Sequence, residues 1–189
     1  MTMTLPTTRA ELDALAAHVP TAARLSVDPL GFVPADGTPD VQEVAAFMAA
    51  GLALGHVKAI GRSVARVIAH LDEPEKLGFQ GHRWIRGPDI AAVVGRLVHL
   101  QREYGSLGQA FAVGYAPGQM KDAMTAFTRQ IRHGLPDTRG VKSLTAAPAD
   151  GSACKRLNLF LRWMVRSGPT DLGLWPHVST GDLFMPLDV

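Results

Sequence analysis

Apolar side chains recur along most of this chain at the three- and four-residue spacing of amphipathic helices. In residues 55–71 they fit a 3.6-residue period closely, while Lys58, Arg62 and Arg66 follow one another at steps of four on the other face. Helical patterns also cover residues 9–19, 39 to the glycines at 51 and 55, 87–104, 107–114, 117–133 and 152–167. No run of residues alternates as a strand does. The pattern predicts an all-α fold, a single compact multi-helix domain over residues 1–189.

Two segments are apolar over more of their circumference than a surface helix tolerates, namely Val44–Ala53 and Leu157–Val165. We expect both to be among the most buried parts of the chain. The segments 24–39, 72–84 and 135–150 are interrupted by proline and glycine, and they are predicted to be loops or irregular. The residues after 167 are expected to form a looser tail, and Trp84 is expected to anchor in the core.

Composition narrows the class of protein. Hydrophobic residues make up 47% and charged residues 19% of the chain, which predicts a folded core rather than wholesale disorder. The single cysteine, Cys154, excludes an internal disulfide, and the seven histidines lack zinc-type spacing, so neither a metal nor a cofactor is expected. The longest hydrophobic segment is shorter than the roughly 20 residues of a membrane span. The N-terminal residues lack the pattern of a signal peptide. We therefore expect a cytoplasmic protein without a membrane partner.

Charge is distributed unevenly along the chain. Residues 1–50 hold two basic and six acidic side chains, residues 51–110 hold eight and five, and residues 111–189 hold nine and six. The net positive charge of residues 51–189, which follow the acidic residues 1–50, permits a polyanionic partner such as DNA. The row of cations within residues 55–71 could hold phosphates or be a plain solvated face. Arg83 and Arg86, on either side of Trp84, loosely resemble a phosphate-gripping loop.

The predicted helix over residues 152–167 carries the most informative pattern. At 100° per residue, Lys155, Arg162 and Arg166 lie within about 40° of one another, opposite the apolar face. Trp163 lies beside this row. An aromatic residue next to aligned cations suits a surface that binds phosphates and bases, although a helix that packs on two sides has the same pattern.

Ser152 is predicted to cap this helix, which would place Cys154 and Lys155 in its first turn. The partial positive charge of a helix N-terminus disfavours an ammonium there by up to about 1 kcal/mol. Together with Arg156, it would favour the neutral, nucleophilic amine of Lys155. The same field would favour a thiolate at Cys154, whose alternative is a small buried hydrophobe.

The run Gly-Ser-Ala-Cys-Lys-Arg-Leu-Asn at 151–158, followed by Leu-Gly-Leu-Trp at 172–175 and Pro-Leu-Asp at 186–188, resembles an uncharacterised bacterial family, a domain of unknown function. The segments 45–60 and 82–97 are similar to the same family. The resemblance therefore covers most of residues 28–188.

A lysine at a helix N-terminus followed by Pro-Leu-Asp is also similar to the helix-hairpin-helix DNA glycosylase superfamily. In its bifunctional members the lysine attacks C1′ of the damaged nucleotide, and a downstream aspartate supports the charge that develops. The resemblance implies these roles for Lys155 and Asp188, whose separation of 33 residues is closer to that of archaeal 8-oxoguanine glycosylases than to that of endonuclease III-like enzymes.

The chain departs from the glycosylase pattern in three ways. Ala149–Ser152 stands in place of the Leu-Pro-Gly-Val-Gly hairpin, there is no four-cysteine cluster, and the chain ends at Val189, where the family continues with further helices. We therefore expect either a truncated product or an incomplete active site. Uncovered apolar residues near the end would then lie loose or mediate self-association; they are Leu183, Phe184, Met185 and Leu187.

Three functions remain open. The first is a base-excision N-glycosylase or lyase that acts on a flipped, damaged base through a lysine Schiff base. The second is a non-catalytic nucleic-acid binder, and the third is a helical interaction module. The candidate catalytic residues are Lys155 and Asp188, and the candidate nucleic-acid-binding residues are Lys58, Arg62, Arg66, Arg83, Arg86, Arg162, Trp163 and Arg166.

Overall fold

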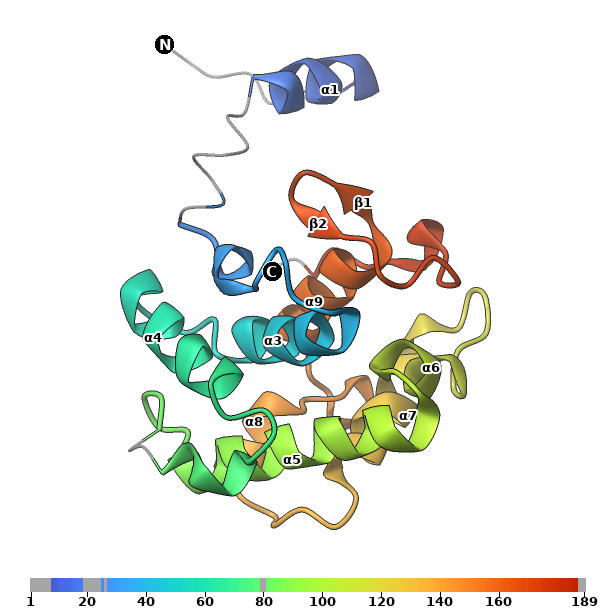
Figure 1. Cartoon of the computed structure of the whole chain (residues 1–189). Helices are drawn as coiled ribbons and strands as arrows, with labels where there is room; N and C mark the ends of the chain where they lie inside the picture. Colours follow the sequence, from blue (N-terminus) through green and yellow to red (C-terminus); the bar gives the residue numbers. More distant parts are fainter. Residues whose placement is uncertain (1–7, 19–24, 26, 79–80, 187–189) are drawn as a thin grey trace.

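The computed structural model describes residues 8–18, 25, 27–78 and 81–186, and it confirms that the chain is mostly helical (Figure 1). The helices are α1 (Arg9–Ala17), α3 (Pro39–Gly51), α4 (Val57–Ile68), α5 (Gly87–Tyr104), α6 (Leu107–Ala112), α7 (Met120–Arg132), α8 (Arg139–Leu144) and α9 (Lys155–Val165). Strands β1 (Ser167–Gly168) and β2 (Asp171–Leu172) form a small antiparallel hairpin in which Ser167 pairs with Leu172.

Helices α3 and α9 lie against each other in the middle of the helical body, and α4, α5 and α6 also pack on α3 (Figure 1). Every residue from Gln42 to Leu52 is buried, and so is every residue of α9 from Leu157 to Val165 except Leu159 and Arg162. The prediction that these two segments would be among the most buried is confirmed. Helix α1 is exposed along its described side chains and stands apart from the body.

The residues after α9 are more ordered than a loose tail, which corrects that expectation. The Trp175 indole is 1% exposed and packs at 5.2 Å, centroid to centroid, from both Phe111 and Phe160. Its Nε1 donates to the buried carboxylate of Glu43 at 2.7 Å. That carboxylate also accepts from the backbone N–H groups of Leu107 and Gly108, which begin α6.

Buried charge at Glu43 therefore joins three distant parts of the chain. A carboxylate without hydrogen bonds would be costly in the core, and here each oxygen accepts at least two. Gly108 permits this arrangement, because an added Cβ would lie 2.8 Å from Trp175 Nε1.

The segments predicted to be loops contain short helical turns that the sequence pattern missed. In the segment 135–150, Thr138 caps α8 by accepting from the Val141 N–H at 3.1 Å, and Pro148–Asp150 forms a 3₁₀ turn. Pro29–Phe32 and Pro74–Leu77 are 3₁₀ turns as well, and so is Thr180–Asp182 near the end of the chain. Such turns are too short to show a periodic apolar face.

Neither of two other features is found in the described part of the chain. No helix there is long and apolar enough to cross a bilayer. Nor does any cluster of three or more His, Cys, Asp or Glu side chains in the described ranges have the arrangement to hold a metal ion.

Candidate nucleic-acid interface and lysine site

Lys155 is the first residue of α9, and its side chain is exposed. The prediction placed it in the first turn, which is correct, but the cap was wrong. The N-cap is Cys154, in a left-handed conformation with φ of 50°, while Ser152 lies two residues further out and its Oγ accepts from the Cys154 N–H at 3.1 Å. The Gly151–Ala153 segment turns sharply, so the helix begins later than its capping residue suggested.

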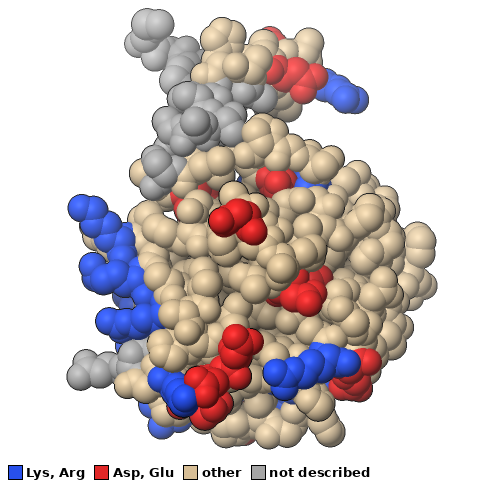
Figure 2. Space-filling model, viewed as in Figure 1, with Lys and Arg blue, Asp and Glu red and all other residues tan. Residues whose placement is uncertain are grey.

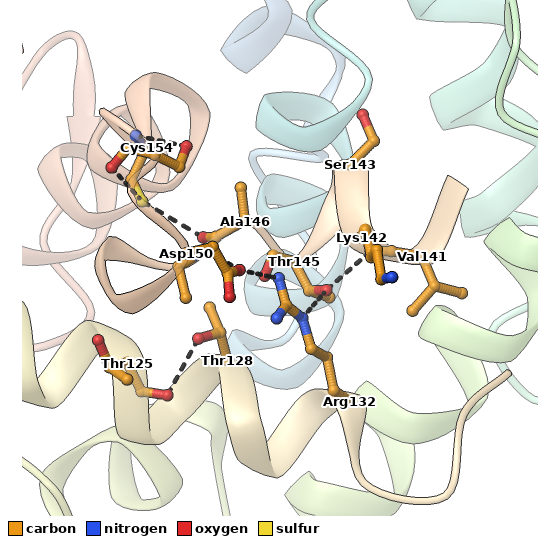
Figure 3. A network of polar contacts seen from close by, with 12 residues as sticks. Thr125, Thr128, Arg132, Val141, Lys142, Ser143, Thr145, Ala146, Asp150 and Cys154 are labelled. Atoms are coloured by element: carbon orange, nitrogen blue, oxygen red, sulfur yellow. Dashed lines mark hydrogen bonds and ion pairs between the residues drawn. The ribbon is translucent and has the colours of Figure 1, made fainter. Parts of the chain in front are cut away.

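A polar network holds the turn that leads to Lys155 (Figure 3). From the end of α7, Arg132 donates to the Thr145 carbonyl at 2.6 Å and to the Asp150 carboxylate at 2.5 Å. Asp150 also accepts from the Ala147 N–H. The hydrogen bond from Arg132 is the main reason that the pKa of Asp150 lies below its ordinary value. The start of α9 is therefore tied to α7 by charge as well as by packing.

Cys154 belongs to this network as a buried group. Its side chain is 4% exposed, and its Sγ donates to the Ala146 carbonyl at 3.4 Å. Burial raises the pKa of the thiol, which disfavours the thiolate. The interpretation as a small buried hydrophobe is confirmed, and the hypothesis of a thiolate-biased cysteine is wrong.

Two hollows adjoin Lys155. A groove of about 590 Å³ runs between α9 and the chain near residues 183–186; it is lined by Lys155, Asn158, Leu159, Arg162, Arg166, Ser167, Thr180, Leu183, Phe184, Met185 and Pro186. A second hollow, of about 290 Å³, lies between the start of α9 and the end of α8. The amine-bearing side chain lines both, so a ligand in either hollow can reach it.

Asn158 is a feature of this groove that the sequence analysis missed. Its side chain is 7% exposed, and its Nδ2 donates to the Cys154 carbonyl at 3.0 Å. This bond fixes the amide orientation, because the two carboxamide atoms could not exchange places without losing it. Its Oδ1 has no hydrogen-bond partner among the residues that the structure describes. The signal in the sequence was an asparagine on the apolar face of a helix.

The groove's arginines are already paired. Arg162 Nε donates to Asp171 Oδ1 at 3.0 Å, and Arg166 Nε lies 3.8 Å from Asp171 Oδ2. The Asp171 side chain is 2% exposed. Asp171 lies on β2, so the hairpin supplies a carboxylate to both members of the predicted cationic row. Their charge is therefore partly neutralised within the protein, and their assignment as nucleic-acid-binding residues stays a prediction.

Trp163 is wrong as a nucleic-acid-binding residue. It is 0% exposed, because α9 packs on two sides and the chain after the hairpin covers the face that periodicity assigned to solvent. The carbonyl of Trp163 accepts from the Gly173 N–H at 3.1 Å. The open alternative of a helix packed on two sides is the correct one.

The end of the chain leaves one candidate untested. Asp188 lies outside the described residues, and so does Leu187. Of the residues expected to be uncovered, Leu183 packs against the core, while Phe184 is 46% and Met185 is 83% exposed. Self-association through this segment stays a prediction.

The cationic row on α4 lies at the surface as predicted. Lys58, Arg62 and Arg66 are exposed, while Ile60, Val64 and Val67 on the other side of the helix are at most 3% exposed. Figure 2 shows Lys and Arg side chains projecting along the left-hand edge of the molecule, where Figure 1 places α4. This face forms a cationic ridge, the name used below for these three side chains.

Next to the ridge, residues 82–85 form a tight turn. The backbone N–H and carbonyl of His82 pair with those of Ile85 at 2.8 and 2.9 Å, which leaves Arg83 and Trp84 at the tip. Trp84 is 40% exposed, so the expectation of a core anchor is wrong. The guanidinium carbons of Arg83 and Arg139 lie 5.4 and 5.5 Å from the centre of its ring. Arg139, which begins α8, was not among the predicted residues.

Arg86 pairs with a buried carboxylate, and its assignment as a nucleic-acid-binding residue stays a prediction. Its guanidinium donates twice to Asp89, whose side chain is 3% exposed. Burial acts to raise the pKa of Asp89, but the hydrogen bonds from Arg86 and Thr138 outweigh it and hold the pKa below its ordinary value. The hydrogen bond from Arg86 to Asp89 in turn raises the pKa of Arg86. Arg86 is thus an ion-paired cap at the start of α5.

Helix α8 connects the turn to Lys155. Arg139, at the start of α8, lies over Trp84, and Ser143, one turn later, accepts from the half-buried Arg156 guanidinium at 2.6 and 3.0 Å. Arg156 adjoins Lys155 and also donates to the Gly51 carbonyl at 2.5 Å. At 1.5 Å per residue, α8 is roughly 9 Å long. The Trp84 turn and the lysine site therefore lie on neighbouring parts of the molecule.

Comparison with known proteins bears on the family alone. No curated protein and no solved structure matches the chain. The family described as "Protein of unknown function (DUF2400)" matches residues 28–189, which is most of the chain and includes the ridge, the turn and Lys155. This agrees with the resemblance to an uncharacterised family, and it brings no support for the similarity to DNA glycosylases. The chain belongs to the DUF2400 family.

Proposed function

We propose that this protein binds DNA and acts on a flipped, damaged nucleotide in the groove beside Lys155, as a base-excision glycosylase or lyase. Phosphates of the DNA backbone would lie along the cationic ridge. The observation that carries the proposal is the pairing of Lys155 with Asn158 in one groove. Both side chains line this groove, and Asn158 Oδ1 is buried without a hydrogen-bond partner among the described residues.

The buried acceptor favours a ligand with a hydrogen-bond donor. An unsatisfied polar atom in a protein interior costs about 1 to 3 kcal/mol, which a ligand N–H would recover. Nucleobases carry N–H and amino donors on their edges, next to flat apolar faces. Leu159 and Phe184 line the same groove and offer apolar surface for such a face. The groove thus has the chemistry of a pocket for one base.

The proposed reaction begins when the Lys155 amine attacks C1′ of the sugar. The bond between C1′ and the base breaks, its electron pair leaves with the base, and the base takes up a proton. The nitrogen then loses a proton, and its lone pair forms a double bond to C1′ as the bond between C1′ and the ring oxygen breaks; the oxygen keeps that electron pair and takes up a proton, which leaves a protonated imine between Lys155 and C1′. Asp188 would support the positive charge that develops on the sugar.

Borohydride trapping tests this chemistry, because it reduces the imine to a stable amine. Duplexes with an abasic site, an oxidised base or a deaminated base are incubated with the protein and then with borohydride. We expect a covalent adduct with the wild-type chain and none with Lys155→Gln. Lys142→Gln is the matched control, because this nearby lysine is exposed, pairs with Asp137 and lines neither hollow.

The opposite result is equally clear. If Lys155→Gln is folded and traps as much product as the wild type, or if the folded wild type traps none on any of these duplexes, Lys155 is not a nucleophile. Asp188→Asn should lower the rate of base release more than it weakens binding, because the carboxylate acts on charge that appears only in the transition state.

A second candidate function is non-catalytic nucleic-acid binding. It is favoured by the cationic ridge and the Trp84 turn, neither of which needs Lys155 to bind a phosphate or a base. A shift of labelled DNA that weakens as salt rises, without trapping, would select this function. Absence of any shift would leave the third hypothesis, a helical interaction module.

A further inference from the structure

We propose that the turn tip formed by Arg83 and Trp84, together with Arg139, is a stacking site for an unpaired base of a nucleic-acid strand. This inference rests on the nucleic-acid-binding part of the proposed function and not on the chemistry at Lys155. It adds a second contact point, separate from the groove, and it specifies the state of the nucleic acid as single-stranded.

The turn is built to keep Trp84 out of the core. His82 and Ile85, on either side of the tip, are 3% and 0% exposed. Both His82 ring nitrogens are engaged, with Ser63 Oγ of α4 at 3.1 Å and with the Leu54 carbonyl at 2.9 Å. Two buried anchors separated by two residues leave the tip residues no route inward. The exposed indole is thus a fixed feature of the fold.

Arg83 adds backbone strain at the same place. Its φ is 54°, a value that non-glycine residues other than Asn and Asp rarely adopt. Strained residues persist only where the surrounding structure holds them, and they are frequent at binding sites. Here the strain directs the Arg83 side chain back over Gly55, where an added Cβ would lie 2.7 Å from Arg83 Nη1. Arg83 thereby lies at the N-terminal end of α4, next to the ridge.

The charges around the tip favour a polyanion over an apolar partner. Among the residues that the structure describes, no carboxylate pairs with Lys58, Arg62, Arg83 or Arg139. By contrast, Arg86, Arg132 and Arg162 all pair with aspartates. The two arginines that lie over Trp84 therefore carry charge that no carboxylate of the described residues neutralises, and so do Lys58 and Arg62 of the ridge.

An unpaired base is the ligand that fits an indole in this setting. A base offers a flat face for stacking and its phosphates offer charge for the arginines, so one nucleotide uses both kinds of group. In a duplex both faces of each base are covered by neighbouring bases, which leaves the indole nothing to stack on.

Tryptophan fluorescence measures this contact directly. Trp163 and Trp175 are 0% and 1% exposed, so Trp84 is the tryptophan that solvent and ligands reach. The probes are a thymidine oligonucleotide and a strand of equal length with the same phosphates and sugars but no bases. We expect the thymidine strand to quench the fluorescence and the base-free strand to bind more weakly without quenching.

Substitutions then separate stacking from charge. Trp84→Ala should weaken binding of the thymidine strand roughly 5- to 150-fold, from about 1–3 kcal/mol per stacked base, and should leave the base-free strand unaffected. Trp84→Phe, which keeps a stacking face, should retain most of the affinity. Arg139→Ala should weaken binding of both strands alike. Thermal unfolding of each variant checks that the substitutions in the exposed turn and at Arg139 have not changed the stability of the fold.

The measurements are repeated in Lys155→Gln to separate this inference from the proposed chemistry. Quenching that survives in Lys155→Gln, with no borohydride adduct in the wild type, supports the stacking site and refutes the lysine chemistry. If Trp84→Ala binds the thymidine strand as tightly as the wild type, or loses equal affinity for the base-free strand, the stacking site is wrong. If neither strand binds, the stacking site is wrong, while the salt-dependent shift of duplex DNA still tests the proposed function separately.

Discussion

Helices α4 and α9 carry the same pattern of cations and use it differently. On α4 the row stands on the surface, and Lys58 and Arg62 have no carboxylate within ion-pairing distance among the described residues. On α9 the corresponding Arg162 and Arg166 share the carboxylate of Asp171, and Arg156 is half-buried. A spacing of four residues between cations thus predicts which side chains share a helix face. The spacing does not predict which other parts of the chain pack on that face.

The two helices differ in the elements that cover their second side. Helix α4 packs on α3 and on the 3₁₀ turns Pro29–Phe32 and Pro74–Leu77, and its ridge side chains are exposed, whereas α9 packs on both α3 and β2. The same contrast separates two tryptophans. Trp163 is buried beside the cations of α9, while Trp84 is exposed beside those of α4. A surface for nucleic acid is therefore best sought where the second packing layer is missing.

Arg156→Ala should produce the largest loss of stability among the proposed variants. A small loss would contradict the difference between α4 and α9. Burial lowers the pKa of Arg156, yet its guanidinium bridges the Gly51 and Ser143 carbonyls. Removing it leaves both acceptors unsatisfied, so the free energy of unfolding should fall by about 3 kcal/mol. Arg62→Ala on α4 should change it by less than about 0.5 kcal/mol. Urea denaturation of the two variants gives both values, and equal values would mean that the two helices do not differ.

The double substitution of Lys58 and Arg62 by glutamine sharpens the comparison through salt dependence. If both contact phosphates, the slope of log affinity for duplex DNA against log salt should become less steep by about 1.8, and affinity near 0.15 M salt should fall about tenfold. The matched pair on α9, Arg162→Gln with Arg166→Gln, should change the slope little, because Asp171 already neutralises these side chains. Equal slopes for the two pairs would contradict the division of roles.

Asp150→Asn tests how the start of α9 is held. Because the pKa of Asp150 is lowered in the folded chain, the ionised carboxylate stabilises the fold above its ordinary value of 3.8, and this stabilisation is lost as pH falls below that value. At pH 7 the variant should lose about 1 kcal/mol, a modest figure because the carboxylate is partly exposed.

Unfolding followed from pH 7 to pH 2 checks the sign. The difference between wild type and Asp150→Asn should shrink as pH falls from 3.8 through the lower pKa of the folded state, because below that pKa both side chains are uncharged. A difference that grows on acidification would mean that Asp150 does not act through its charge. Asp13→Asn on the exposed α1 is the control, and it should leave the unfolding free energy unchanged within about 0.5 kcal/mol.

The long helices could be predicted because their information is local. Periodic apolar positions located α3, α4, α5, α7 and α9, and the prediction that α3 and α9 would be most buried rests on apolar residues all round the helix. The six-residue α8 gives no such signal, since Gly140 lies inside it and only Thr138 marks its start. Trp175 was assigned to a tail because its partner, Glu43, lies 132 residues away.

The candidate site was predicted in part for the same reason. The position of Lys155 depends on a local turn, and the prediction missed only the identity of the cap. Arg162 is paired because Asp171 lies on the β1–β2 hairpin. The strands of this hairpin have two residues each, which is too short for the alternating pattern that predicts a strand. The exposure of Trp84 depends on the anchoring of His82 to α4, again a distant contact.

Asp171→Asn should give the smallest effect and the one most specific to the comparison, because it makes α9 resemble α4. The substitution removes the negative charge that Arg162 and Arg166 share, while the amide still accepts a hydrogen bond from Arg162. The two guanidiniums then face the groove with their charge uncompensated, so affinity for DNA should rise about threefold at low salt, and the salt slope should steepen by about 1.

The control is Asp122→Asn, which changes the net charge equally. Asp122 is exposed in the first turn of α7 and lines neither hollow beside Lys155, so this variant should leave the affinity nearly constant. A rise of equal size in both variants would attribute the gain to net charge rather than to the groove. No rise in Asp171→Asn would mean that phosphates do not reach α9, and DNA contact would then be confined to the ridge and the Trp84 turn.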